Sequence, residues 1–142
     1  MTRFAISVVA LFVASMVTGF VVHGLLLAAD YQKLAGTLFR TPEDSQSHFA
    51  WMLIGHVVLA IGFTWMYRAG RDLRPWLGQG LRFGLAVATL SVIPTYLIYY
   101  AVQPMPADLV VKQVVLDTIA VVLLGLVTAA INRDPIVARA AA

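Results

Sequence analysis

Residues 4–29 read FAISVVALFVASMVTGFVVHGLLLAA and contain no formally charged side chain. A helix of about 20 mostly apolar residues is long enough to cross the roughly 30 Å of hydrocarbon in a bilayer. The stretch therefore predicts a transmembrane helix. Because the apolar region of a cleaved signal peptide is only about 7–15 residues long, we expect this helix to stay in the protein.

Three more apolar stretches follow, at 49–67, 83–102 and 109–131, and only the last one carries charges. Together with 4–29 they predict an all-α fold, an integral membrane antiparallel four-helix bundle that forms a single transmembrane domain over residues 1–142. Apolar side chains scattered among polar ones in segment 31–40 predict a short interfacial helix or loop.

The composition of the whole chain agrees with a membrane location. Hydrophobic residues make up 61% of the 142 residues and charged residues only 12%, with a mean hydropathy of +0.85. A soluble domain carries about a quarter charged residues, so a soluble enzyme and a disordered tail are excluded. The sequence has no cysteine, which excludes disulfide scaffolds and thiolate metal sites.

The basic residues predict the orientation of the bundle. Seven arginines fall at the N-terminus, between the second and third helices and in the C-terminal tail, whereas three basic residues fall on the other side. The positive-inside rule then places both termini in the cytoplasm. This distribution explains the net charge of +3 without a nucleic-acid partner. The seven are Arg3, Arg68, Arg71, Arg74, Arg82, Arg133 and Arg139, and the three are Lys33, Arg40 and Lys112.

Small residues predict where the helices pack, because close backbone approach drives helix association in lipid. Each predicted helix carries such residues at helical spacing, so we expect each to have a face that a neighbour approaches closely. They are Ser15 and Gly19, Gly55 and Gly62, Gly80, Gly84 and Ala88, and Gly125 and Ala129. Thr41-Pro42 has the form of an N-cap followed by a first-turn proline, and we expect the second helix to begin there and enter the membrane near Trp51.

Each of the four helices also brings a polar side chain to one layer in the outer half of the bilayer. His23, His56 and Asp117 lie about 10–13 Å inside the outer boundary by helical rise, and Thr95 and Tyr96 follow Pro94 at a similar level. Ionisable groups inside a span are costly and mark functional sites by default. We therefore predict a ligand-binding pocket open to the outer leaflet, lined by His23, His56, Thr95, Tyr96, Gln113 and Asp117.

Several chemistries fit this layer. It can be purely structural, with Asp117 paired to a histidine, Lys112 or Gln113. His23 and His56 can instead ligate a haem b axially or bind a metal ion with Asp117, or the pocket can take a small amphipathic ligand. No HExxH, Gly-x-Ser-x-Gly or phosphate-binding loop occurs. A non-catalytic accessory or scaffold subunit is therefore favoured over an enzyme, with the lipid bilayer, other membrane subunits or further copies of itself as partners.

Two motifs carry a resemblance to known proteins. Tyr31-x-x-Leu34-x-Gly36-x-x-Phe39-Arg40, and Gly80-x-x-Phe83-Gly84 leading to Pro94, resemble small uncharacterised four-helix membrane proteins of bacteria. The resemblance covers most of the chain and implies the four-helix fold. Because that group has no assigned activity, it implies no functional residue.

Overall fold

A computed structural model describes residues 2–72 and 75–133. This part of the chain is helical and has no β-strand. Four stretches of helix are long and apolar enough to cross a membrane, namely Thr2–Leu26, Phe49–Gly70, Trp76–Val102 and Ala107–Asn132. The predicted all-α four-helix fold is thus confirmed. The elements are α1 (Thr2–Gly19), η1 (Phe20–Leu26), α2 (Ala28–Leu34), α3 (Pro42–Ser47), α4 (Phe49–Gly70), α5 (Trp76–Val87), η2 (Ala88–Val92), α6 (Ile93–Val102) and α7 (Ala107–Asn132).

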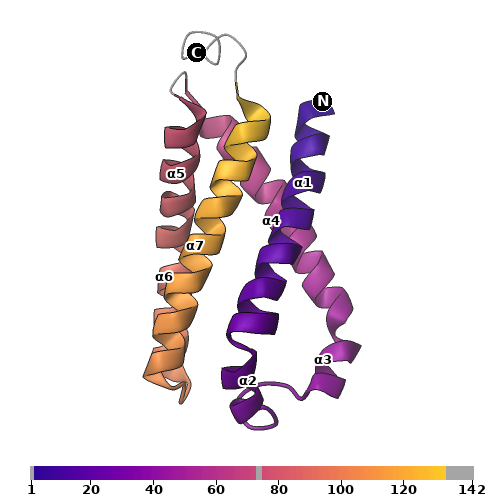
Figure 1. The fold of residues 1–142 in the computed structure, drawn as a ribbon, viewed down its shortest axis with the longest axis vertical. Helices are drawn as coiled ribbons and strands as arrows, with labels where there is room; N and C mark the ends of the chain where they lie inside the picture. The colour runs from indigo at the N-terminus through magenta and orange to yellow at the C-terminus, as the bar shows by residue number, and fades with distance from the viewer. Residues whose placement is uncertain (1, 73–74, 134–142) are drawn as a thin grey trace.

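The last helix, α7, is the centre of the bundle (Figure 1). It packs against α1, α5, η2 and α6, and to a lesser extent against α4, which crosses behind α1. The start of α1 and the end of α7 lie at the same end of the bundle, where buried Asn132 Nδ2 donates a hydrogen bond to Ser7 Oγ over 2.8 Å. We call this the arginine end, because Arg3, Arg68, Arg71, Arg82 and Arg133 flank the helices there.

Glycines bring α5 and α7 into direct backbone contact. A Cβ atom on Gly84 would lie 2.6 Å from Val122 Cα, and one on Gly125 would lie 2.5 Å from the carbonyl oxygen of Gly80. No side chain fits in that space. These three residues form what we call the glycine seam, and they confirm the close approach that small residues predict on these two helices.

The corresponding expectation for the second helix is wrong. A Cβ atom on Gly55 or Gly62 would meet nothing within 4 Å, so these glycines do not face a neighbouring helix. The helix α4 packs instead through larger buried side chains such as Phe63, whose ring meets Phe83 edge to face at 4.8 Å. Spacing by seven residues indicates a shared face but not which neighbour covers it.

The second helix also begins later than predicted. Thr41 does cap a helix, since its side chain accepts a hydrogen bond from Asp44 N over 3.3 Å, and Pro42 is the first helical residue. That helix, however, is the short α3, and α4 begins separately at Phe49. The break falls at His48, whose Nδ1 and the neighbouring Ser47 hydroxyl both contact the Asp44 carbonyl oxygen. Side-chain bonds to backbone groups of this kind compete with helix continuation.

The third span begins at Trp76, seven residues before the apolar run that the sequence marks at Phe83. Its first turns carry Gln79 and Arg82, which lower the hydropathy without disfavouring a helix. The first span, in contrast, ends at Leu26, and the chain bends at Leu27 before α2.

Both the first and the third spans change from α- to π-helical geometry part-way along. The reason for η2 is Pro94, which has no N–H and whose ring clashes with the carbonyl group four residues earlier. The backbone widens ahead of it, and Ile93 N donates to the carbonyl oxygen of Ala88, five residues back. Segment η1 contains His23. Such π-helical turns inside α-helices often occur at functional sites.

The end of the bundle opposite the arginine end is covered by α2 and the loop after it. Tyr31, Leu34, Leu38 and Phe39 pack against a buried cluster that includes Leu109 of α7. Gly36 adopts φ +76° in this loop, a left-handed conformation that a glycine takes at no steric cost. The predicted short helix or loop at 31–40 is thus α2 followed by a loop.

Candidate functional site

Asp117 of α7 joins two other helices through its carboxylate. Its Oδ1 lies 3.2 Å from His23 Nε2 of η1, and its Oδ2 accepts a hydrogen bond from the Tyr96 hydroxyl of α6. Only 15% of the Asp117 side chain is exposed. Of the three partners that the sequence offers Asp117, the structure shows the histidine.

The other ring nitrogen of His23 continues the chain of contacts. His23 Nδ1 lies 2.8 Å from the Tyr31 hydroxyl, which also accepts a hydrogen bond from Gln113 Nε2 over 3.1 Å. Sequence reasoning missed Tyr31 as part of this group and placed it only in the interfacial segment. Its spacing of eight residues from His23, a little over two helical turns, was the available signal. We call the five connected side chains the polar layer: His23, Tyr31, Tyr96, Gln113 and Asp117.

The donors in the polar layer assign its protons when His23 is neutral. Gln113 donates to Tyr31, so the Tyr31 hydroxyl is free to donate to His23 Nδ1. His23 then carries its proton on Nε2 and donates it to Asp117. Burial raises the pKa of Tyr31, which keeps this hydroxyl protonated at neutral pH. Every hydrogen bond in the series thus runs towards the carboxylate of Asp117.

His56 of α4 belongs to a second contact. Its Nδ1 lies 2.9 Å from Ser15 Oγ of α1, so this pair links the first two transmembrane helices. The imidazole lies beside Gly19, where an added Cβ atom would be 3.4 Å from His56 Cε1. The small residue at position 19 therefore provides the room for the ring.

The two groups of polar residues face one open pocket of about 300 Å³. His23, His56, Thr95, Tyr96 and Asp117 line it, and all five come from the predicted set. Gln113, the sixth predicted residue, is buried and reaches the pocket wall only through Tyr31 and His23. The remaining lining residues are small, hydroxyl-bearing or aliphatic: Ser15, Thr18, Gly19, Leu59, Ser91, Val92, Ala120, Val121 and Leu124.

Both π-helical segments border this pocket. Segment η1 contributes His23, and η2 contributes Ser91 and Val92. Thr95 and Tyr96 follow directly in the next turn, after Pro94. The widened turns thus set the direction of the polar side chains on two of the four spans.

An ion pair lies near the same end of the bundle. Lys112 Nζ contacts Asp30 Oδ2 at 2.8 Å and Asp108 Oδ2 at 3.7 Å. The hydrogen bond from Lys112 lowers the pKa of Asp30, which keeps the pair charged at neutral pH. Lys112 therefore pairs with Asp30 and Asp108 and not with Asp117, although Lys112 and Asp117 lie on the same helix.

Metal binding by the predicted residues has a specific difficulty at His23. Both of its ring nitrogens already have partners, Asp117 and Tyr31, so ligation of a haem or metal ion requires one of these bonds to break. Within residues 2–72 and 75–133, no three His, Cys, Asp or Glu side chains converge as a metal site would need. A metal ion or haem held by His23 and His56 stays a prediction.

Comparison with known proteins identifies a family but no activity. Neither the search of curated proteins nor the search of solved structures gives a match. One family model, described as "Protein of unknown function (DUF1761)", matches residues 6–129. This range contains all four spans almost completely, together with every residue of the polar layer. The chain therefore belongs to the DUF1761 family.

Proposed function

We propose that this chain is a non-catalytic integral membrane protein that binds a small amphipathic ligand in the pocket beside the polar layer. The observation that carries the proposal is the pocket of about 300 Å³, in which ionisable side chains from three spans meet aliphatic walls. Ligand sites are mostly apolar cavities with a few well-placed polar groups. A buried carboxylate that served only to hold the helices together would not need an open cavity beside it.

The unused hydrogen-bonding groups in the pocket indicate how such a ligand would bind. His56 Nε2 makes no hydrogen bond to any residue in the described part of the chain, while His56 Nδ1 is held by Ser15. The Thr95 side chain is exposed and lines the same pocket. A polar head group that accepts or donates hydrogen bonds would meet these two residues. Its apolar part would lie against Leu59 and Leu124.

A binding role fits the surroundings of His56 better than catalysis does. Ser15 and His56 form a serine–histidine contact, which in hydrolases needs a third group to orient the imidazole. Among the residues that the structure describes, His56 has no carboxylate partner. The Ser15 hydroxyl also contacts the carbonyl oxygen of Phe12 at 2.9 Å, which ties it to its own helix.

The membrane and orientation belong to the same proposal. The four apolar spans support a bilayer location, and the arginine end supports a cytoplasmic position for both termini of a bacterial inner-membrane protein. The pocket then opens in the outer half of the bilayer, where the chain would work alone, as a homo-oligomer or as an accessory subunit. A reporter that works only in the cytoplasm should be active when it is fused after Ala142. If a reporter that works only in the periplasm is active there instead, the proposed orientation is wrong.

The binding proposal is tested by the molecules that copurify with the protein. Full-length protein, purified in mild detergent, is extracted with organic solvent, and bound small molecules are quantified by mass spectrometry. Asp117→Asn should lower the occupancy of a specific copurifying molecule at least tenfold while the protein stays folded. Asp108→Asn is the matched control, since that carboxylate lies on the same helix with 70% of its side chain exposed.

The same preparation separates the alternatives. A Soret band that disappears in His23→Ala and His56→Ala would mean that the bound molecule is haem and not an amphipathic ligand. Equal occupancy of every small molecule in wild type and Asp117→Asn would contradict the binding proposal and leave the polar layer structural. Turnover of a defined substrate that one pocket substitution abolishes would contradict the non-catalytic role.

A further inference from the structure

A second pocket, of about 210 Å³, lies at the arginine end, away from the polar layer. It is formed where the end of α4 meets the start of α5, and its lining includes Tyr67, Arg71, Gln79 and Arg82. Among the described lining residues Asp72 is the one acidic residue, and it is itself engaged in an interaction. Two arginines, Arg71 and Arg82, therefore give this lining an excess of positive charge.

Arg71 is held in place at the pocket by the end of α7. Its Nη1 donates a hydrogen bond to the carbonyl oxygen of Asn132 over 2.9 Å. That contact uses one of the five N–H groups that a guanidinium offers, so the others remain available. Asn132 is in turn fixed by Ser7 and Thr128, which makes this arginine a preorganised donor.

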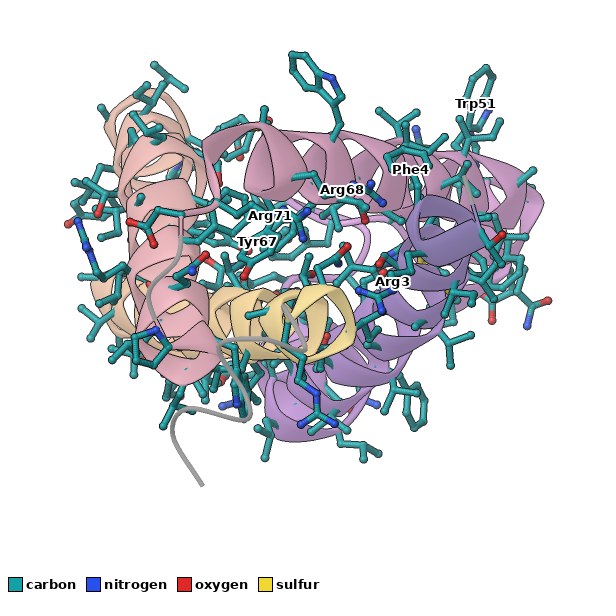
Figure 2. All side chains as sticks on the ribbon, turned by 90° about the horizontal axis from the view of Figure 1, so that it is seen from above. Arg3, Phe4, Trp51, Tyr67, Arg68 and Arg71 are labelled. Carbon is teal, nitrogen blue, oxygen red and sulfur yellow. The ribbon has the colours of Figure 1, made fainter. Side chains whose placement is uncertain are left out.

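Arg68, in the last turn of α4, adds positive charge at this end of the bundle. Its Nη1 is buried and has no hydrogen-bond partner among the described residues. The guanidinium lies over the ring of Phe4, with Cζ 5.8 Å from the ring centre. Figure 2 looks onto this end of the bundle and shows Arg3, Arg68 and Arg71 there. Arg68 does not line the pocket, so it adds positive charge to this end of the bundle without being a direct ligand group.

The start of α5 strengthens the preference for an anion. The first N–H groups of a helix have no acceptor within the helix and carry a partial positive charge. Pro75 is the N-cap of α5 and has no side-chain acceptor to satisfy them. The first intrahelical bond is Gln79 N to Pro75 O, over 3.2 Å, and Gln79 lines the pocket. Residues 76–78 are not among the described lining residues, so this helix end acts on the pocket through its partial positive charge from one turn away.

We propose that this pocket binds the phosphate group of an anionic phospholipid. Arginine side chains and helix N-termini are the groups that proteins use for phosphate, and basic pockets between transmembrane helices bind lipid head groups. The pocket lies between the ends of two transmembrane spans, Phe49–Gly70 and Trp76–Val102. This position places it at the level of the lipid head groups, which favours a lipid over free phosphate.

This site is independent of the ligand proposed for the polar layer. The two pockets share no lining residue, so either proposal can fail while the other holds.

The test uses full-length protein in nanodiscs of phosphatidylcholine with or without phosphatidylglycerol, and native mass spectrometry of the lipids that stay bound. Wild type should retain phosphatidylglycerol in preference to phosphatidylcholine and should melt at a higher temperature when it is present. Arg82→Gln should bind phosphatidylglycerol about fivefold more weakly, which is the factor that ~1 kcal/mol per basic residue near an anionic membrane corresponds to. Because Arg82 is exposed, the variant should fold normally.

Two further measurements make the test decisive. Arg40→Gln is the matched control, because Arg40 is also an exposed arginine but lies at the other end of the bundle and pairs with Asp44. It should retain phosphatidylglycerol as wild type does. Inorganic phosphate added in phosphatidylcholine nanodiscs should not reproduce the stabilisation. Full stabilisation by inorganic phosphate would mean that the pocket binds a free anion and not a lipid. If Arg82→Gln and Arg71→Gln both retain as much phosphatidylglycerol as wild type, the proposed site is wrong.

Discussion

In its C-terminal half, α7 touches α5 through the glycine seam, whereas in its N-terminal half side chains of the polar layer stand between α7 and its neighbours. The same helix is thus joined to the rest of the bundle in two ways. Where backbones meet, as at Gly84 and Gly125, there is no room for a Cβ atom. Where side chains of intermediate size meet, as at Asp117, the helices stay far enough apart to leave a pocket of about 300 Å³.

The comparison shows how one short bundle can be rigid and still hold a cavity. Association of helices in lipid depends on close packing and polar contacts, and this chain separates the two along α7. The glycine seam supplies contact over a large area, and the polar layer supplies specific hydrogen bonds. We therefore expect substitutions in the seam to affect stability most and substitutions in the layer to affect binding.

The largest loss of stability is expected for Gly84→Ala. The new Cβ atom would lie 2.6 Å from Val122 Cα, a backbone atom that cannot move without shifting α7. Overpacking of this kind typically costs about 1–3 kcal/mol, which thermal unfolding in detergent would measure. Gly62→Ala is the control, because a Cβ atom there meets nothing within 4 Å. Equal melting temperatures for the two variants would contradict the glycine seam.

A smaller loss is expected for Tyr31→Phe in the polar layer. The substitution removes the hydroxyl that contacts both His23 and Gln113, and it leaves the buried Gln113 amide without its partner. We expect a cost of about 1 kcal/mol in the free energy of unfolding. Tyr99→Phe should change nothing, because Tyr99 is 46% exposed. If Tyr31→Phe is as stable as wild type, the hydroxyl does not hold the layer together.

Ser15→Ala tests the contact between the first two spans. It removes the hydroxyl that meets His56 Nδ1 at 2.9 Å, and hydrogen bonds between transmembrane helices average about 0.6 kcal/mol. The released imidazole should also bind the pocket ligand less tightly, which copurification would show. Thr89→Ala serves as the comparison, since that hydroxyl bonds to Leu85 O of its own helical segment and does not line the pocket. A larger effect at Thr89 than at Ser15 would exclude His56 as an oriented ligand group.

The smallest effect is expected from acidification at the Asp30–Lys112 pair. The pKa of Asp30 is lowered in the folded protein by the hydrogen bond from Lys112. The pair therefore stabilises the fold fully above the unfolded pKa, near 3.8, and this contribution is lost as the pH falls through the lower folded value. Melting temperatures measured from neutral pH down to pH 3 should fall less steeply in Asp30→Asn than in wild type. If the melting temperatures of wild type and Asp30→Asn fall in parallel with pH, the pair makes no measurable contribution to stability.

The sequence predicts the four spans because the signal for each is long and depends on local hydropathy alone. Its predictions are less accurate where the structure depends on single contacts. The short α3 ends at Ser47 because the side chains of Ser47 and His48 bond to the Asp44 carbonyl oxygen, and hydrophobic periodicity carries no signal for such a contact. Gly55 and Gly62 have the spacing of a packing face, but whether a neighbour covers it depends on the crossing of α4, which the sequence does not specify.

The same limit applies to the candidate site. Helical rise predicts that His23, His56, Tyr96 and Asp117 lie at one depth, and all four line one pocket. Depth is a property of each helix separately, so the sequence can supply it. The identity of each partner requires the rotation of one helix against another and the bend at Leu27 that brings Tyr31 back to His23. That the pocket binds a ligand stays a prediction from its chemistry.

The π-helical segment η2 has a consequence for how this chain tolerates insertions and deletions. Each residue of an α-helix turns the chain by about 100°, and η2 accommodates its extra residue through the bond from Ile93 to Ala88. Because the wider turn absorbs that residue, the segments on either side keep the relative direction that a regular α-helix one residue shorter would give them. Deleting one residue between Ala88 and Val92 should therefore leave Tyr96 facing Asp117 and leave Gly80 and Gly84 in their contacts. The same deletion in the regular helix α7, between Asp117 and Gly125, would instead turn the polar layer by about 100° against the glycine seam.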